Sequence, residues 1–493
     1  MSAHVPTFDF DNSYARELDG FFVPWQGAKV PDPKVLRLNR DLAGELGLDA
    51  AALAGAGGAA VLSGAVAPEG AAPLAMAYAG HQFGGFSPQL GDGRAILVGE
   101  MIGRDGQRRD LHLKGSGRTP FSRGGDGKAV LGPVLREYLM GEAMHGLGIP
   151  TTRALAAVTT GERIMRDGFE PGAVLARVAA SHLRVGTFQF FAARGETARL
   201  RQLADYAIAR HYPGIAPRDD RYLELFRQVR DAQAALVAKW VNVGFVHGVM
   251  NTDNTTISGE TIDYGPCAFI DAYDPAAVFS SIDRNGRYAY GNQPVIMQWN
   301  LARLAETLID LVNPDDSDDA IRQLTNEINA FPAQYQRDWL AGMRAKLGLA
   351  KALPEDLDLA NDLLTAAEGQ NVDFTGLFRA LAEAARGDAA PARALFDDPA
   401  AFDAWLERYV RRMAAEDLPG LARAQAMDAV NPLYIPRNHL VEAALQAAGK
   451  GDMDPFERLL AVLALPFDEQ PGAAEFAGPA PEGFGPYTTF CGT

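Results

Sequence analysis

Cysteine is nearly absent from this chain. Only Cys267 and Cys491 occur among the 493 residues. Two cysteines are too few for a disulfide scaffold, and these two lack the spacing of metal ligands. We interpret both as ordinary thiols of a protein that folds in a reducing compartment.

Long apolar runs are also missing, so no membrane helix is predicted. Met1 to Leu18 carries acidic residues and has no apolar core, which argues against a signal peptide. The uncharged stretch Ala51 to Ala67 is mostly Ala and Gly, and we expect it to form a helix or loop on the surface. A cytoplasmic protein with no membrane partner is therefore expected.

Positive charge is scarce, because 62 acidic residues outnumber 46 basic ones and the net charge is −16. Such a surface repels phosphate backbones, so nucleic acid is not expected as a partner. An acidic protein that handles an anionic nucleotide must gather its cations locally. With 47% hydrophobic residues the chain can bury a sizeable core.

The pattern of residues changes near His182, from strand-like to helical. Ala95 to Glu100, Asp110 to Lys114, Ala154 to Met165 and Ala173 to Ala180 read as strands, and Asp92-Gly93 is expected to supply the positive φ of a turn before the first of them. Predicted helices are 130–147, 197–210, 219–243, 296–312, 317–347, 373–385 and 399–415. Pro391 to Pro399 reads as a linker and Pro471 to Pro486 as a loose tail.

These patterns predict an α+β protein with two lobes and a polar cleft between them. The predicted divisions are a small β-rich, nucleotide-binding N-lobe with an N-terminal extension (1–181), a large, mostly helical C-lobe (182–470) and a C-terminal tail with Cys491 (471–493).

A tight group of polar residues follows the long predicted helix 219–243. His247 to Asn254 is followed, nine residues later, by Asp263-Tyr264-Gly265. Asn254 and Asp263 offer oxygen ligands of the kind that Mg²⁺ accepts, and Asp253 beside them is able to take a proton from an incoming hydroxyl. An Asp-Asn pair alone is more often a turn or a helix cap. Its position between apolar segments favours a site that holds metal and ATP.

Lys114 and Glu137 make a second candidate pair. The lysine ends a strand, the basic, glycine-rich loop 115–127 follows, and the next helix carries the glutamate. A glutamate in that place is able to hold the ammonium group while it faces phosphate. Taken alone, the pair also fits a surface lysine and a solvated glutamate. Because the pair precedes the metal motif along the chain, the two together favour an ATP-dependent transferase.

The ordered set Lys114, Glu137, Asp253-Asn254 and Asp263-Tyr264-Gly265 resembles a protein-kinase-like fold. Longer segments resemble the selenoprotein O family, from about residue 10 to the C-terminus. These segments are Leu90 to Arg94, Leu113 to Arg123, His247 to Asn254, Asn292-Gln293-Pro294 with Trp299-Asn300-Leu301, and Asn431 to Tyr434.

The resemblance implies a protein adenylyltransferase that binds ATP in an inverted orientation and moves AMP onto Ser, Thr or Tyr hydroxyls of proteins. It implies Asp253 as proton acceptor, Asn254 and Asp263 as ligands of Mg²⁺, with Mn²⁺ as an alternative, and Glu137 as the partner of Lys114. The nucleotide-binding positions that it implies are Gly91, Gly93, Arg94, Lys114, Asp126, Gly127, Arg177, Arg184 and Asp263. A monomer is expected.

Two features of the residues themselves agree with altered kinase chemistry. Arg177 and Arg184 fall where a kinase cups uncharged adenine, although guanidinium groups suit phosphate. Val249 stands where common kinases carry the catalytic aspartate, which leaves Asp253 as the replacement. A phosphotransferase and a non-catalytic ATP-binding scaffold remain alternatives. Cys491 matches the family's terminal selenocysteine or cysteine, and it is either a plain thiol or a redox switch that bonds Cys267 or a substrate protein.

Overall fold

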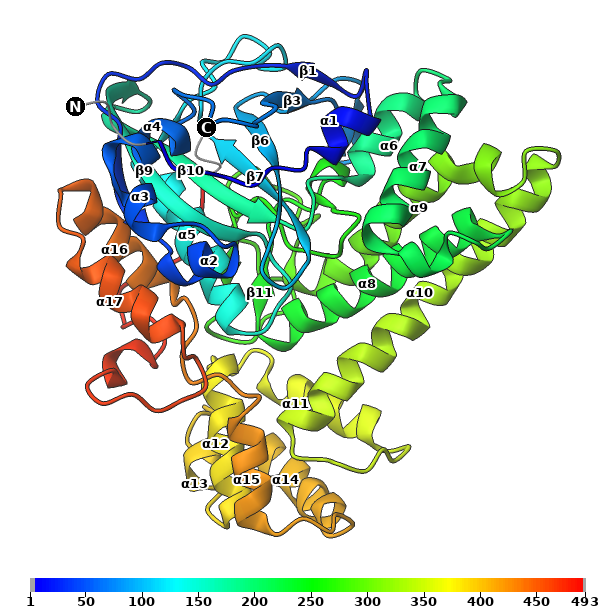
Figure 1. Ribbon diagram of the computed structural model, residues 1–493. Coiled ribbons are helices and arrows are strands. Elements are labelled where there is room, and N and C mark those ends of the chain that lie inside the picture. Colours follow the sequence, from blue (N-terminus) through cyan, green and yellow to red (C-terminus); the bar gives the residue numbers. More distant parts are fainter. Residues whose placement is uncertain (1–4, 491–493) are drawn as a thin grey trace.

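The computed structural model describes residues 5–490 of the 493. A strand-rich N-terminal part lies against a larger helical C-terminal part (Figure 1). The prediction of a mixed α and β protein, with a β-rich N-terminal region and a helical C-terminal region, is therefore confirmed. Among residues 5–490, no helix combines the length and the apolar character needed to cross a membrane.

One antiparallel sheet forms the centre of the N-terminal part. Its strand order is β1-β3-β6-β7-β10-β9-β2, and the short β8 pairs with β10. The strands are β1 (Phe22–Pro24), β2 (Lys34–Leu38), β3 (Leu74–Met76), β6 (Ala95–Ile102), β7 (Arg108–Lys114), β8 (Ala129–Val130), β9 (Arg153–Met165) and β10 (Phe169–Ala179). The four segments expected to be strands in this region are β6, β7, β9 and β10.

The two faces of the sheet bury different sets of residues, because side chains alternate along a strand. In β10, Val174, Ala176 and Val178 face a cluster that includes helices α2 (Arg40–Glu45), α3 (Ala50–Ala54) and α4 (Ala56–Leu62). Leu175 faces the other way, into the cluster of helix α5 (Leu131–Gly146). Arg177 shares that second face by its position, so the alternation directs it toward α5.

The stretch Ala51 to Ala67 forms most of α3 and α4, as expected, but the prediction that it lies on the surface is wrong for about half of its residues. Leu53, Ala59, Val61 and Leu62 are buried against the sheet. Gly58 permits this packing, since a Cβ there would lie 2.0 Å from the carbonyl oxygen of Leu53. The small Ala and Gly residues of this segment therefore allow its helices to pack closely.

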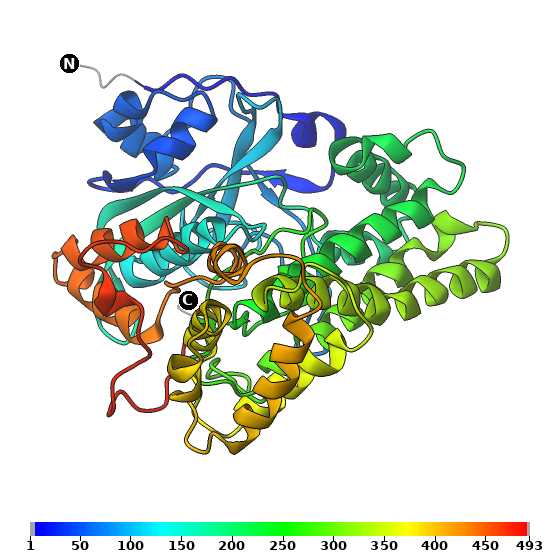
Figure 2. The same cartoon turned by 90° about the horizontal axis from the view of Figure 1, so that it is seen from below.

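The helical part has a main body and a projection (Figures 1 and 2). The body is formed by α6 (Val185–Ala192), α7 (Thr197–His211), α8 (Arg221–Asn242), α9 (Gln293–Val312) and α10 (Ser317–Lys346). The projection holds α11 (Asp356–Ala367), α12 (Phe374–Arg386), α13 (Ala390–Arg393), α14 (Ala400–Met413) and α15 (Gly420–Asp428). Helices α16 (Asn438–Gly449) and α17 (Asp454–Leu463) return to pack on α5.

Short elements complete the fold and carry the loops of the site. They are α1 (Ser13–Glu17), β4 (Gly80–Gln82), β5 (Gly85–Ser87), β11 (Phe245–Val246), β12 (Ala268–Phe269) and the 3₁₀ turns at Pro213–Ile215, Thr252–Asn254, Tyr290–Asn292 and Ala474–Phe476. The pair β11–β12 brackets the segment from His247 to Asp263.

Two expectations about flexible segments are wrong. The expected linker Pro391 to Pro399 contains most of α13 and the buried Phe396, which packs on Phe402. The expected loose tail is docked, since Phe476 is buried and Arg437 donates to the Ala477 carbonyl at 2.7 Å. Composition alone does not show that a few apolar side chains anchor such segments.

Cys267 is a buried free thiol, and burial raises its pKa to about 11. This agrees with an unreactive side chain. Cys491 lies outside the described residues.

Glu260 holds the segment that connects the two parts of the chain. The Ala180 amide donates to its Oε2 at 3.0 Å and so does the Ser258 hydroxyl, also at 3.0 Å. Burial raises the pKa of Glu260 from 4.5 to about 7. Because the folded-state pKa is the higher one, this group stabilises the fold at low pH, and that stability is lost as pH rises through about 7.

The Glu260→Gln variant should therefore be more stable than the wild type at pH 8, by on the order of 2 kcal/mol, and the difference should disappear at pH 4. Urea unfolding at both pH values measures it. The exposed Glu407 provides the control Glu407→Gln. An equal effect of Glu260→Gln at both pH values would contradict the titration of this carboxyl.

Candidate active site

One cleft of about 420 Å³ gathers nearly all of the site residues predicted from the sequence. Its lining includes Gly91, Gly93, Arg94, Lys114, Asp126, Gly127, Arg177, Arg184, Asp253, Asn254 and Asp263. Glu137 lies directly behind the cleft, in contact with Lys114. Residues from both parts of the chain thus meet in a single cavity.

Strand register explains how the basic residues converge. Lys114 on β7 is opposite Leu175 on β10, and His112 is opposite Arg177. Lys114 and Arg177 are therefore near neighbours on adjacent strands. Arg184 follows the end of β10 and precedes helix α6, whose first residue is Val185.

A buried ionic cluster occupies the floor of the cleft. Lys114 Nζ lies 2.6 Å from Glu137 Oε2 and 2.6 Å from Asp263 Oδ1. Arg177 lies 2.9 Å from Glu137 Oε1 and 2.8 Å from Asp263 Oδ1, and Arg184 lies 3.0 Å from Asp263 Oδ2. Three cations thus share two carboxylates, which leaves one net positive charge.

Asp263 is the centre of this cluster. Burial alone would raise its pKa, but Lys114, Arg177 and Arg184 more than offset this and hold the pKa well below its usual range. Its backbone has φ +65°, a conformation that non-glycine residues rarely adopt. The surrounding contacts maintain the strained backbone of Asp263, and the three cations keep its carboxylate ionised.

Three residues that support the arginines were not predicted. Arg177 Nε donates to His112 Nδ1 at 3.2 Å, so the opposite ring nitrogen carries the proton and donates to Asp92 Oδ2 at 3.1 Å. The guanidinium of Arg184 lies 4.7 Å from the ring centre of Tyr78. Asp92 belongs to the Leu90 to Arg94 motif, so the sequence offered a way to predict it. His112 and Tyr78 are flanked by apolar residues, and no motif marks them.

Asp253 lies in a different environment from Asp263. Its side chain accepts one hydrogen bond, from Gln82 Nε2 to Oδ2 at 3.1 Å, while its backbone carbonyl accepts from Arg184 at 2.6 Å. Burial raises the pKa of Asp253 to about 6, although the nearby Arg184 opposes this. Two carboxylates that line the cleft therefore differ in basicity, since Asp263 is strongly acidic and Asp253 is more basic.

Asn254 ends the 3₁₀ turn Thr252–Asn254. Its Nδ2 donates to the Val249 carbonyl at 3.1 Å, which turns the amide oxygen away from that carbonyl. Within residues 5–490, no group of three or more His, Cys, Asp or Glu side chains is arranged to hold a metal ion.

The glycines of the cleft are needed for two different reasons. Gly91 has φ +70°, and Gly93 instead lies so close to the Phe121 carbonyl oxygen that a Cβ would be 2.9 Å away. The positive φ expected at Gly93 is therefore wrong, because the turn before β6 takes it at Gly91. Gly127 combines both features, with φ +70° and 2.1 Å between its hypothetical Cβ and the Gly117 carbonyl oxygen.

Asp126 is engaged by the protein itself. Its two carboxylate oxygens accept from the guanidinium of Arg166 at 3.0 Å each. Lys128 Nζ, on the same loop, lies 2.5 Å from Glu162. These pairs fix the loop between β7 and β8 over the cleft.

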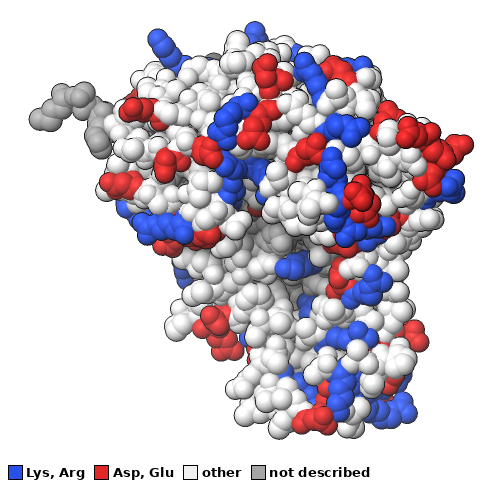
Figure 3. Space-filling view, turned by 45° about the vertical axis from the view of Figure 1, so that its right-hand side comes forward, with Lys and Arg blue, Asp and Glu red and all other residues white. Residues whose placement is uncertain are grey.

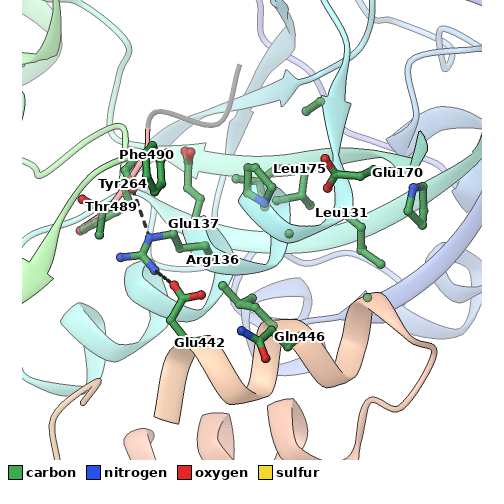
Figure 4. Close-up of a pocket in the computed structure, with 18 of the residues that line it drawn as sticks. Leu131, Arg136, Glu137, Glu170, Leu175, Tyr264, Glu442, Gln446, Thr489 and Phe490 are labelled. Carbon is green, nitrogen blue, oxygen red and sulfur yellow. Dashed lines mark hydrogen bonds and ion pairs between the residues drawn. The ribbon is translucent and has the colours of Figure 1, made fainter. Parts of the chain in front are cut away.

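A larger cavity of about 810 Å³ adjoins this cleft and is walled by α5, β10, α16 and residues 484–490 (Figure 4). Arg136 and Glu442 point toward one another across it, 3.5 Å apart. Arg136 also donates to the carbonyls of Gly265 at 3.1 Å and Cys267 at 2.5 Å. This arginine thereby links α5 to the segment that follows Asp263. Lys114 lines both cavities, Glu137 lines the larger one, and Asp253, Asn254 and Asp263 line the smaller cleft.

Acidic and basic side chains are interspersed over the face of the molecule that Figure 3 shows. Inside the cleft, the buried cluster around Asp263 contributes one net positive charge. A low-dielectric surrounding strengthens the attraction of such a cluster for an anion.

A cleft with this charge distribution, between a strand-rich and a helical part, is typical of enzymes that bind a phosphorylated nucleotide and transfer part of it. A family model described as "Protein adenylyltransferase SelO" matches residues 5–464. The chain belongs to this family and is an ATP-using enzyme of the nucleotidyltransferase class.

Relatives from several bacteria support the assignment over the full length of the chain. A protein from Cereibacter sphaeroides named "Protein nucleotidyltransferase YdiU" is 62% identical, with 99% of this chain and 100% of the relative aligned. Proteins of the same name from a Mycobacterium species and from Rhizobium meliloti are 58% and 56% identical, again over 99% of this chain and 100% of each relative.

Proposed function

We propose that this adenylyltransferase binds ATP with the β- and γ-phosphates directed toward Arg177 and Arg184, and transfers AMP to Ser, Thr or Tyr hydroxyls of proteins. Support comes from the buried cluster in which three cations share two carboxylates. Guanidinium groups at this depth suit phosphate oxygens and not the edge of a purine. With the terminal phosphates held inside, the α-phosphorus lies nearer the mouth, where a protein hydroxyl can reach it.

Asp253 is the proposed proton acceptor. The hydroxyl oxygen of the acceptor forms a bond to the α-phosphorus, and its proton passes to the Asp253 carboxylate. The bond from the α-phosphorus to the α,β-bridging oxygen breaks, and pyrophosphate leaves. A carboxyl whose pKa is raised to about 6 is basic enough to accept the proton and is still ionised near neutral pH.

The proposed Mg²⁺ ligands are Asn254 and Asp263, with Mn²⁺ as an alternative ion. The fit rests on an amide oxygen that is turned away from its neighbouring carbonyl and on a carboxylate that stays ionised. When bound, the ion would neutralise charge on the phosphate oxygens. Lys114, held by Glu137, is proposed to contact the phosphates as well.

The arrangement of residues 1–181 as an N-lobe and 182–470 as a C-lobe, with the tail beyond, remains our proposal for a protein-kinase-like architecture. It is supported by the order of the Lys114 strand, the Glu137 helix and the loops that carry Asp253 and Asp263. Gly91, Gly93, Arg94, Asp126 and Gly127 would form the outer wall of the nucleotide site.

ATP labelled on either the α- or the γ-phosphate tests the proposed reaction. The enzyme is incubated with each form, Mg²⁺ and a soluble cell extract, and labelled proteins are analysed by mass spectrometry. Label from the α-position, with the mass of AMP on a hydroxyl side chain, is expected. Label from the γ-position alone would favour phosphoryl transfer, and unlabelled protein in both samples would contradict AMP transfer to proteins.

The inverted orientation predicts a selective effect of Arg177→Ala. If the arginine holds the terminal phosphates, ATP affinity should fall about 10- to 100-fold while AMP affinity changes less than about threefold. Calorimetric titration with each nucleotide measures both. Arg163→Ala, on β9 and outside the cleft lining, is the control. An equal loss of affinity for ATP and AMP would favour adenine in the depth of the cleft.

A further inference from the structure

The β4–β5 hairpin packs on the loop that carries Asp253. Its two strands pair between Gly80–Gln82 and Gly85–Ser87. The His81 amide donates to Thr252 Oγ1 at 2.7 Å, and the Phe83 amide donates to Asn251 Oδ1 at 3.1 Å. Gln82, between them, reaches Asp253 Oδ2 at 3.1 Å. Three successive residues of the hairpin thus bind three successive residues of the loop.

The two oxygens of the Asp253 carboxylate are not equivalent. Oδ1 is enclosed and accepts no hydrogen bond from any described residue. It lies beside Gly80, where a Cβ would come within 2.7 Å of it. An incoming hydroxyl can therefore reach only Oδ2, and this is the oxygen that Gln82 holds.

We propose that Gln82 is a positioning residue for the AMP-transfer reaction. It donates to Oδ2 of Asp253, fixes the plane of that carboxylate and leaves the remaining lone pair of Oδ2 for the acceptor hydroxyl. This inference rests on the proposed role of Asp253. Neither the sequence motifs nor the family comparison assigns a role to Gln82.

The backbone next to Gln82 supports a functional role for the hairpin. Phe83 has φ +50°, a left-handed conformation that is costly for an aromatic residue. It persists because Asn251 and the Tyr288 hydroxyl, at 3.1 Å each, both bind its amide. Gln82 and Phe83 also line the cleft. The strained tip therefore holds the Gln82 side chain over the carboxylate.

The test compares Gln82→Ala, which removes the donor, with Gln82→Glu, which keeps the shape and places a second carboxylate against Asp253. Initial rates of α-phosphate labelling are measured with a fixed amount of cell extract over a range of ATP concentrations. Gln82→Ala should lower the maximal rate at least about fivefold without changing the KM for ATP, and Gln82→Glu should lower it further. Ser87→Ala, on the same hairpin, is the control.

The same substitutions are repeated in the Asp253→Asn background. If Gln82 acts through Asp253, Gln82→Ala should have no further effect there, whereas a merely structural role would lower the rate equally in both backgrounds. A loss below about fivefold in the wild-type background, or equal losses in both, overturns the inference. Absence of α-label with the wild-type enzyme would instead overturn the proposed function.

Discussion

Asp253→Asn should reduce AMP transfer to a low residual rate and leave ATP binding intact. Loss of a general base typically lowers the rate by about 10²- to 10⁴-fold. ATP affinity should stay within about threefold, because the ionic cluster of Lys114, Arg177 and Arg184 does not include the Asp253 side chain. Rates of α-phosphate labelling and calorimetric titration with ATP measure the two effects separately.

The same variant should be at least as stable as the wild type. Asp253 is buried with a raised pKa, and its Oδ1 accepts no hydrogen bond from a described residue, so its charge opposes folding at neutral pH. Removal of that charge should stabilise the fold by on the order of 1 kcal/mol. Asp274→Asn, at an exposed aspartate outside the cleft lining, controls for loss of charge in general. Wild-type turnover by Asp253→Asn would remove the base assignment.

Asp263→Asn, unlike Asp253→Asn, should impair Mg²⁺-dependent ATP binding and lower the stability of the fold. It would leave Lys114 and Arg177 with Glu137 as their remaining carboxylate, and it would remove the carboxylate that pairs with Arg184. Breaking a buried ionic cluster from one side typically costs about 3 to 5 kcal/mol. We therefore expect a clear decrease in the urea midpoint of unfolding.

ATP binding by Asp263→Asn should also lose its dependence on Mg²⁺. The wild-type enzyme should bind ATP more tightly with Mg²⁺ than without it, while the variant should bind equally in both conditions, because the phosphates still meet the three cations but one ion ligand is gone. Thermal shifts with ATP, with and without Mg²⁺, measure this even in a destabilised variant. An unchanged response to Mg²⁺ would contradict the assigned ligand, and Asp274→Asn again serves as control.

Sequence patterns predicted most of the regular structure because its periodicities are strong. The run of apolar residues in β10 and the helical spacing around Leu135 fix strand and helix locally. The segment 51–67 and the Pro391 to Pro399 segment were misjudged for one common reason. Their burial depends on packing against other helices and strands, and such contacts leave no periodic signal within the segment itself.

Most residues of the candidate site could be predicted from sequence motifs. Lys114, Glu137, Asp253 and Asp263 occur along the chain in a recognisable order. Gln82 could not be predicted in this way, because it meets Asp253 across 171 positions of the chain. The glycines around it indicate a turn but do not show which loop the turn contacts.

The sequence by itself determined which charged residues the protein contains and the order in which they occur. It also determined the local strands and helices that carry them. The tertiary structure alone decided how those groups share charge. Asp263 is held ionised by three cations, and Asp253, ten positions earlier, is made more basic by burial. Both carboxylates have the same chemistry in an unfolded chain, and only the distance to neighbouring charges and the exclusion of water make them differ.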